Sequence, residues 1–172
     1  MNLNFRKWVE THKLLLLYVL IVILIIIFDQ WTKSLIIKNV MLYEVLPVNS
    51  FINISHQENA GAAFSILSNA GGWQRWFLSV LAICISVYIV FWLFRLRNQD
   101  QIILSIGLSL VLGGAIGNVI DRIQLGYVID YIQVFIMGWP FPSFNIADAS
   151  ITVGAVILII DALFISKNSV FD

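Results

Sequence analysis

Four long apolar stretches, separated by shorter mixed ones, dominate the pattern of the chain. The first uninterrupted run, LLLLYVLIVILIIIF, covers residues 14–28. Lys13 can snorkel and Trp31 suits a membrane interface, so we extend this span to about 13–31. A bilayer core requires about 20 such residues. The pattern therefore predicts four transmembrane helices, the other three at about 73–94, 102–120 and 146–165.

The first apolar run follows the basic residues FRKW, as the apolar core of a secretory signal peptide does. No small-residue cleavage site comes after it, since the run ends in FDQWTK. We therefore expect this segment to be retained as a transmembrane helix.

Two segments between the spans show the alternation of polar and apolar residues that is typical of short strands. They lie within residues 33–72, which include SFINISHQ, and residues 121–145, which include YVIDYIQVF. Pro140 and Pro142 are expected to bracket a turn. The predicted fold is that of a mainly α membrane protein. Residues 1–172 form one integral membrane domain, a four-transmembrane-helix bundle with a small β-rich extracytoplasmic platform.

The basic residues are distributed unequally between the two sides of this topology. Those on the side of the termini are Arg6, Lys7, Lys13, Arg95, Arg97 and Lys167, and those on the other side are Lys33, Lys38, Arg75 and Arg122. Basic residues concentrate on the cytoplasmic side of membrane proteins. We therefore expect both termini in the cytoplasm and the β-rich segments at the outer face.

Composition supports a membrane protein, because 60% of the residues are hydrophobic and only 12% are charged. Ten basic and ten acidic residues balance, so nothing indicates a nucleic-acid partner. Cys84 is the only cysteine, which excludes an internal disulfide, and we expect it to be a small packing residue. His12 and His56 are isolated, so we expect no transition-metal site.

Most of the ionisable residues near the spans are expected at one membrane boundary. Asp29, Asp121, Arg122 and Asp148 fall at outer helix ends, and Asp130 lies in the outer loop. Such residues are costly at membrane depth and usually face a bundle interior or a wet cavity. Asp161, farther along the last span, is expected at the cytoplasmic end with a structural role.

Several of these charges have structural interpretations. Asp121 and Arg122 can form an ion pair or anchor lipid headgroups. Asp29 and Lys33, four residues apart, can form a helix-end pair. Asp148 suits a helix N-terminus, although Ser143 and Asn145 are the more suitable capping residues.

Asp130 and Asp148 can also serve as a catalytic pair. Two carboxylates at a semi-buried site share a proton, and they then supply a general acid and a general base. The residues alone leave other interpretations open. These are a structural network, a lipid or phosphoryl transferase holding Mg²⁺ through Asp121, Asp130 and Asp148, an ion-coupled transporter, and a non-enzymatic scaffold.

Four motifs in order resemble those of the lipoprotein signal peptidases (signal peptidase II), a family of bacterial membrane aspartic proteases. They are DQWTK at residues 29–33, ENAGAAF at 58–64, GGAIGNVIDRIQLGYVIDY at 113–131 and FNIADASI at 144–151. The resemblance covers nearly the whole chain. The sequence VIDY stands where VVDF is common in the family.

The resemblance implies that Asp130 and Asp148 are the catalytic pair, with no metal and no cofactor. The implied site-lining and supporting residues are Asn59, Gly61, Asn118, Asp121, Arg122, Asn145, Asp29 and Lys33. The implied reaction removes the signal peptide from a diacylglyceryl-modified prolipoprotein just before the lipidated cysteine. The expected setting is the bacterial cytoplasmic (inner) membrane, with membrane lipids as partners and a monomer as the active form.

Overall fold

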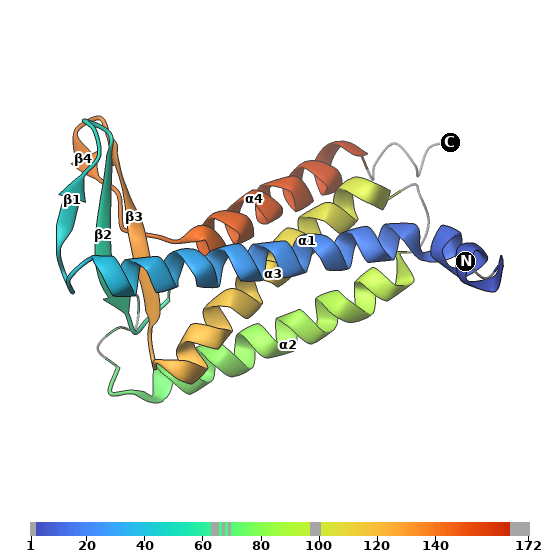
Figure 1. The fold of residues 1–172 in the computed structure, drawn as a ribbon, viewed down its shortest axis with the longest axis horizontal. Helices are drawn as coiled ribbons and strands as arrows, with labels where there is room; N and C mark the ends of the chain where they lie inside the picture. The colour runs from blue at the N-terminus through green and yellow to red at the C-terminus, as the bar shows by residue number, and fades with distance from the viewer. Residues whose placement is uncertain (1–2, 63–65, 67, 69, 97–100, 166–172) are drawn as a thin grey trace.

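Four helices form a bundle, and a small sheet lies at one end of it (Figure 1). A computed structural model describes residues 3–62, 66, 68, 70–96 and 101–165. The helices are α1 (Leu3–Asn39), α2 (Trp73–Arg95), α3 (Ile102–Gln124) and α4 (Ile146–Ile160), and α4 continues into the π-helical turn η3 (Asp161–Ile165). Each is long and apolar enough to cross a membrane, which confirms the four predicted spans.

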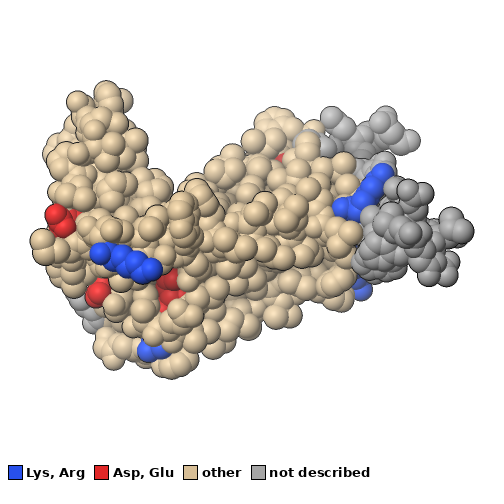
Figure 2. Space-filling model, viewed as in Figure 1, with Lys and Arg blue, Asp and Glu red and all other residues tan. Residues whose placement is uncertain are grey.

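The start of α1 and the end of η3 lie at the end of the bundle opposite the sheet (Figure 1). This arrangement agrees with an even number of spans. Arg97 and Lys167, which contribute to the charge bias, lie outside the described residues. Figure 2 shows Lys and Arg side chains toward the two ends of the molecule and a long uncharged surface between them.

Two helices extend further than expected. α1 continues to Asn39, so residues 33–39 are helical rather than part of an outer loop. The extra turns of α1 are held by the sheet, because Ile36 and Val40 pack with Ile129 and Tyr131. α3 likewise runs to Gln124, beyond the expected end of the span at residue 120.

The platform is a four-stranded antiparallel sheet in the order β1-β2-β3-β4. Its strands are β1 (Val45–Pro47), β2 (Ile52–Asn59), β3 (Val128–Ile136) and β4 (Trp139–Pro140). The two predicted strand segments correspond to β2 and β3. The prediction of a turn bracketed by prolines is wrong, because Pro140 belongs to β4. The turn lies at Met137 and Gly138, whose positive φ angles of 53° and 81° suit a two-residue hairpin.

α3 is the central helix, and α1, α2 and α4 all pack on it. Close approach to α4 depends on small residues, as is typical of membrane helices. A Cβ atom at Gly114 would collide with the Ala147 carbonyl oxygen, and one at Gly154 would lie 2.7 Å from the Gly107 carbonyl oxygen.

The outward faces of the helices are apolar and exposed, as expected for surfaces in contact with lipid. Cys84 lies on such a face of α2, so the expectation that it packs in the interior is wrong. The core instead contains Tyr18 of α1, Ile89 of α2, and Leu108 and Leu112 of α3.

Gly114→Leu is expected to lower the free energy of unfolding by roughly 1–3 kcal/mol, because α3 and α4 must separate to admit the side chain. Thermal or denaturant unfolding in detergent measures the loss. Ile123→Ala, on an exposed face of the same helix, is the control and should change stability little. Equal effects of the two substitutions would contradict this account of the helix packing.

Candidate active site

A buried lysine bridges two carboxylates where the bundle meets the sheet. The Lys33 Nζ atom lies 2.8 Å from Asp29 Oδ2 and 2.8 Å from Asp121 Oδ2. All three side chains are buried. The expected Asp29–Lys33 pair is therefore present, and it includes a third charge from α3.

The two carboxylates also join elements that are distant in sequence. Asp29 on α1 accepts a hydrogen bond of 3.0 Å from the backbone N–H of Ala147 in the first turn of α4. Asp121 on α3 accepts one of 3.3 Å from the backbone N–H of Ile129 on β3. One group of three charges thus fixes α1, α3, α4 and the strand that carries Asp130.

Gln30 completes this group, and the sequence reasoning did not identify it. Its Nε2 atom donates to Asp121 Oδ1 (2.8 Å), to Asp29 Oδ2 (3.2 Å) and to the Gly117 carbonyl oxygen (3.2 Å). The only available signal was its place inside the DQWTK motif.

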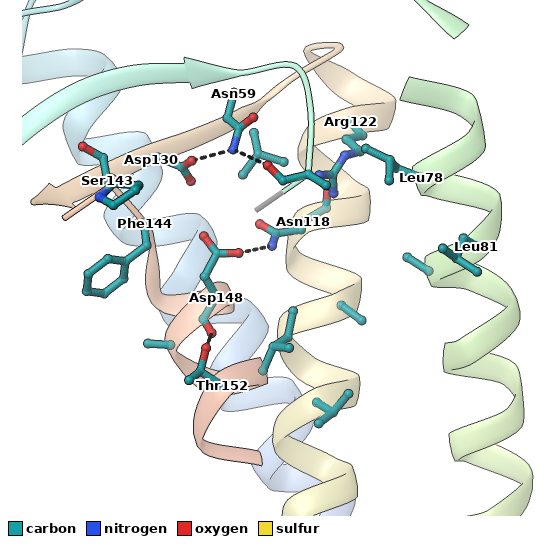
Figure 3. A pocket seen from close by; sticks show the side chains of 18 of the residues that line it. Asn59, Leu78, Leu81, Asn118, Arg122, Asp130, Ser143, Phe144, Asp148 and Thr152 are labelled. Atoms are coloured by element: carbon teal, nitrogen blue, oxygen red, sulfur yellow. Dashed lines mark hydrogen bonds between the residues drawn. The ribbon is translucent and has the colours of Figure 1, made fainter. Parts of the chain in front are cut away.

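Lys33 also sets the orientation of the Asn118 amide. Its Nζ atom donates to Asn118 Oδ1 at 3.1 Å, so the amide nitrogen must point the other way. That nitrogen donates to Asp148 Oδ1 at 2.8 Å (Figure 3). The buried cation thereby determines that Asn118 presents a donor to Asp148.

Asp148 is held at the N-terminus of α4. Asn145 is the N-cap residue, its side chain accepts from the Asp148 N–H at 2.8 Å, and Asp148 Oδ2 accepts from the Asn145 N–H at 3.2 Å. This capping box confirms Asn145 as the cap residue.

Asp130 lies on β3 and is buried. Asn145 Nδ2 donates to its Oδ1 at 2.8 Å and Asn59 Nδ2 to its Oδ2 at 3.0 Å. Burial, and after it the nearby Asp148 carboxylate, raise the pKa of Asp130 to about 7, although the Asn59 and Asn145 hydrogen bonds and the Lys33 charge act against the shift. Asp130 is therefore suited to hold a proton near neutral pH.

Arg122 does not pair with its neighbour Asp121, so the predicted ion pair is wrong. Asp121 faces Lys33, and the adjacent Arg122 points about 100° away from it around the helix. The Arg122 Nη2 atom donates to the Gly61 carbonyl oxygen at 2.8 Å, which fixes the loop after β2. Its buried Nε–H finds no acceptor among the described residues.

A cavity of about 670 Å³ lies between α2, α3, α4 and the loop after β4. Asp130 and Asp148 face it from the sheet and from α4 (Figure 3). Its other polar lining includes Asn59, Asn118 and Arg122, and its apolar lining includes Leu78, Leu81, Ala82, Ile85, Val111, Ala115, Ile151 and Val153. The cavity therefore has a polar end at the sheet and an apolar end along the helices.

The expected site residues thus divide into two layers. Asn59, Asn118, Arg122, Asp130 and Asp148 line the cavity, whereas Gly61, Asn145, Asp29, Lys33 and Asp121 lie behind it. Gly61 is among the residues expected at the site, and its lack of a side chain allows another group to approach closely. In the structure, a Cβ atom there would collide with the Ile66 carbonyl oxygen, so the close approach is made by the chain itself. The motif residues Ala63 and Phe64 lie outside the described residues.

The magnesium alternative requires three carboxylates facing one point. Asp121 does not line the cavity, because Lys33 and Gln30 occupy its oxygens. Within the described parts of the chain, no group of three His, Cys, Asp or Glu residues is placed to hold a metal ion. The cavity presents two carboxylates, which is the arrangement of an acid–base pair.

Lys33→Met is expected to lower the free energy of unfolding by roughly 3–5 kcal/mol, because it leaves two buried carboxylates without their cation. Unfolding in mixed micelles measures the loss. Lys38→Met is the matched control, since Lys38 is exposed on the same helix. Adding Asp121→Asn to Lys33→Met should restore part of the stability. A double variant no more stable than the single one would contradict the bridging role.

The stability of the protein should depend on the ionisation of Asp130. Because its pKa is raised when folded, its contribution to stability is greatest below the unfolded pKa and is lost as the pH rises through about 7. Asparagine does not ionise, so the Asp130→Asn variant does not lose this stability as the pH rises. The melting temperature of the variant relative to wild type should therefore rise between about pH 5 and about pH 8. A difference independent of pH would contradict a raised pKa.

Comparison with known proteins agrees with this geometry. A family model of signal peptidase (SPase) II matches residues 21–164, a range that includes all of the site residues above. A lipoprotein signal peptidase of Acinetobacter baumannii is 47% identical over 146 residues, which cover 85% of this chain and 82% of the relative. One of Teredinibacter turnerae is 44% identical over 160 residues, covering 91% and 95%.

Solved structures show the same fold. A bacterial membrane enzyme structure is 35% identical, has a TM-score of 0.78, and aligns over 88% of this chain and 90% of its own. A second, with the same identity, has a TM-score of 0.74. Sequence and structure agree over most of the chain, which therefore belongs to the signal peptidase II family.

Proposed function

We propose that this protein is a membrane aspartic endopeptidase that removes signal peptides from prolipoproteins. Its substrate carries a diacylglyceryl group on a cysteine, and cleavage occurs just before that cysteine. The observation that carries the proposal is a single cavity with Asp130 and Asp148 at its polar end and apolar helix side chains along the rest.

The shape of the cavity suits such a substrate. Leu78, Leu81 and Ile85 of α2 and Ile151 and Val153 of α4 supply an apolar lining for acyl chains or the apolar part of a signal peptide. Several of these side chains are also exposed on the outside of the bundle, so the lining is continuous with the lipid-facing surface. The peptide bond next to a lipidated residue would then lie at the polar end of the cavity.

The two carboxylates have different environments and so take different roles. Asp148 accepts hydrogen bonds on both oxygens at a helix N-terminus and serves as the general base. Asp130, with its pKa raised to about 7, is the protonated general acid. The division follows from position, because Asp130 is buried on a strand and Asp148 lies in the first turn of a helix.

The reaction then needs no covalent intermediate. Asp148 takes a proton from water while the water oxygen attacks the scissile carbonyl carbon, and Asp130 protonates the carbonyl oxygen. In the second step one hydroxyl of the resulting diol returns a proton to Asp130, Asp148 protonates the leaving nitrogen, and the C–N bond breaks. Both carboxyl groups end in their starting states.

Three neighbouring side chains position the substrate. Asn118 and Asn59 hold the two carboxylates and border the cavity. Arg122 lines the cavity, and its guanidinium can stabilise the negative charge that develops on the substrate carbonyl oxygen. Asp29, Lys33, Asp121, Asn145 and Gly61 support these residues from behind.

The membrane arrangement completes the proposal. The protein resides in the bacterial cytoplasmic membrane with both termini in the cytoplasm, so the sheet and the cavity are at the outer face. Residues 1–172 act as a single integral domain. A monomer suffices, because one chain supplies both carboxylates and their supporting residues.

Asp130→Asn and Asp148→Asn are each expected to lower the rate of cleavage of a purified diacylglyceryl-modified prolipoprotein by more than about a hundredfold. The assay is run in detergent with EDTA present throughout. Arg122→Ala should be impaired less than either, because it removes a positioning group and neither proton-transfer group.

Asp161→Asn is the matched control. Asp161 is also a buried carboxylate, but it does not line the cavity, and its replacement should leave most of the activity. An asparagine variant at 130 or 148 that cleaves at nearly the wild-type rate would contradict the paired mechanism. A wild-type enzyme that requires restored Mg²⁺ would contradict it as well.

A further inference from the structure

Two turns form the tip of the sheet. Residues 48–51 connect β1 to β2, and residues 137–138 connect β3 to β4. The turns are adjacent, because the Phe135 N–H donates to the Phe51 carbonyl oxygen at 2.8 Å. We call this region the sheet tip; its apolar residues are Val48, Phe51, Ile136, Met137 and Trp139.

The sheet tip is apolar and exposed. Met137 is 97% exposed, Trp139 79% and Phe51 68%. Residues 45–57 and 131–147 contain no Lys, Arg, Asp or Glu. In Figure 2, the upper part of the sheet shows no charged side chain on its visible face. Sheets in water usually protect their edge strands with charges, and this one does not.

The β3–β4 turn gives a second indication. Met137 has a φ of 53°, in a position where Asn, Asp or Gly is usual. A fully exposed methionine in a left-handed conformation contributes neither packing nor turn stability to the chain. Local strain of this kind clusters at functional sites, where a contact uses the strained conformation.

The placement of the tip points to the partner. In Figure 1 the sheet does not extend straight away from the bundle but projects sideways, past the side on which α4 lies. α4 is a membrane-spanning helix and carries exposed Val153, Val156 and Ile160. The tip therefore overhangs lipid that surrounds α4.

We propose that the sheet tip is a membrane anchor that rests in the headgroup–acyl boundary of the leaflet on the sheet side of the bilayer. Its partner is the phospholipid bilayer itself. Tryptophan prefers this boundary, and an uncharged, apolar turn inserts there without desolvating charges. The inference concerns the sheet alone and does not depend on the proposed proteolytic activity.

The anchor has a consequence for the cavity. The chain leaves β4 through Phe141, Pro142, Ser143 and Phe144, which line the cavity directly. Phe144 is also bonded to β3, since its backbone N–H donates to the Ile132 carbonyl oxygen at 3.0 Å. A tip fixed in the leaflet therefore holds this wall of the cavity at a constant depth relative to the lipid.

The test places one fluorescent label on the tip and one on a control site. In a Cys84→Ala background, Met137→Cys and Met41→Cys are each labelled with an environment-sensitive NBD dye and incorporated into phosphatidylcholine nanodiscs. Met41 is a matched control, since it is also an exposed methionine (75%) but follows the end of α1 beyond the span. Quenching by doxyl-labelled phosphatidylcholine and by aqueous iodide is compared.

The label at position 137 should be quenched by the doxyl lipid and should be several-fold less accessible to iodide than the label at position 41. Equal iodide access at both positions would overturn the proposal. Protection from iodide that grows with the number of copies per disc, without doxyl quenching, would also overturn it and indicate a second copy. If Met137→Cys does not incorporate, Trp139→Cys provides the same test.

Discussion

The site depends on one buried cation placed between two carboxylates. The Lys33 ammonium group is buried at the junction of bundle and sheet, where an unpaired charge is strongly disfavoured. Its presence there is tolerable only because Asp29 and Asp121 come from two different helices to meet it. Each carboxylate also accepts a hydrogen bond from the backbone of a further element. Asp121 accepts one from β3, and Asp29 accepts one from α4. The pairing of the buried Lys33 charge and the relative positions of four elements are thus established by the same three side chains.

Two asparagine side chains fix the orientation of the hydrogen-bond donors that reach the carboxylates of the cavity. An amide has a donor end and an acceptor end, so fixing one end fixes the other. Lys33 occupies the acceptor end of Asn118, and the donor end reaches Asp148. Asn145 caps α4 with its oxygen and reaches Asp130 with its nitrogen. Both carboxylates therefore receive donors whose orientation is decided away from the cavity.

Much of this arrangement could be predicted from the sequence. The hydrophobic pattern gave four spans, because span length follows from bilayer thickness, and the motifs placed Asp130 and Asp148 together. The partner of Asp121 could not be predicted, because helical phase directs it away from adjacent Arg122 and toward Lys33, 88 residues earlier. The role of Gln30 depends on three acceptors that only the folded chain brings together. The extra turns of α1 follow from packing on the sheet, a contact that hydropathy does not encode.

The apolar lining of the cavity merges with the outside of the bundle, since Leu81, Ile85 and Val153 belong to both. A ligand that enters along such a surface arrives by diffusion within the plane of the bilayer. Its effective concentration is then a number of molecules per unit area of membrane, so adding lipid dilutes it even when the volume of the sample is unchanged. Occupancy of this cavity is consequently governed by mole fraction in the membrane, and an apolar inhibitor would be enriched at the site by its partitioning before it makes any contact with the protein.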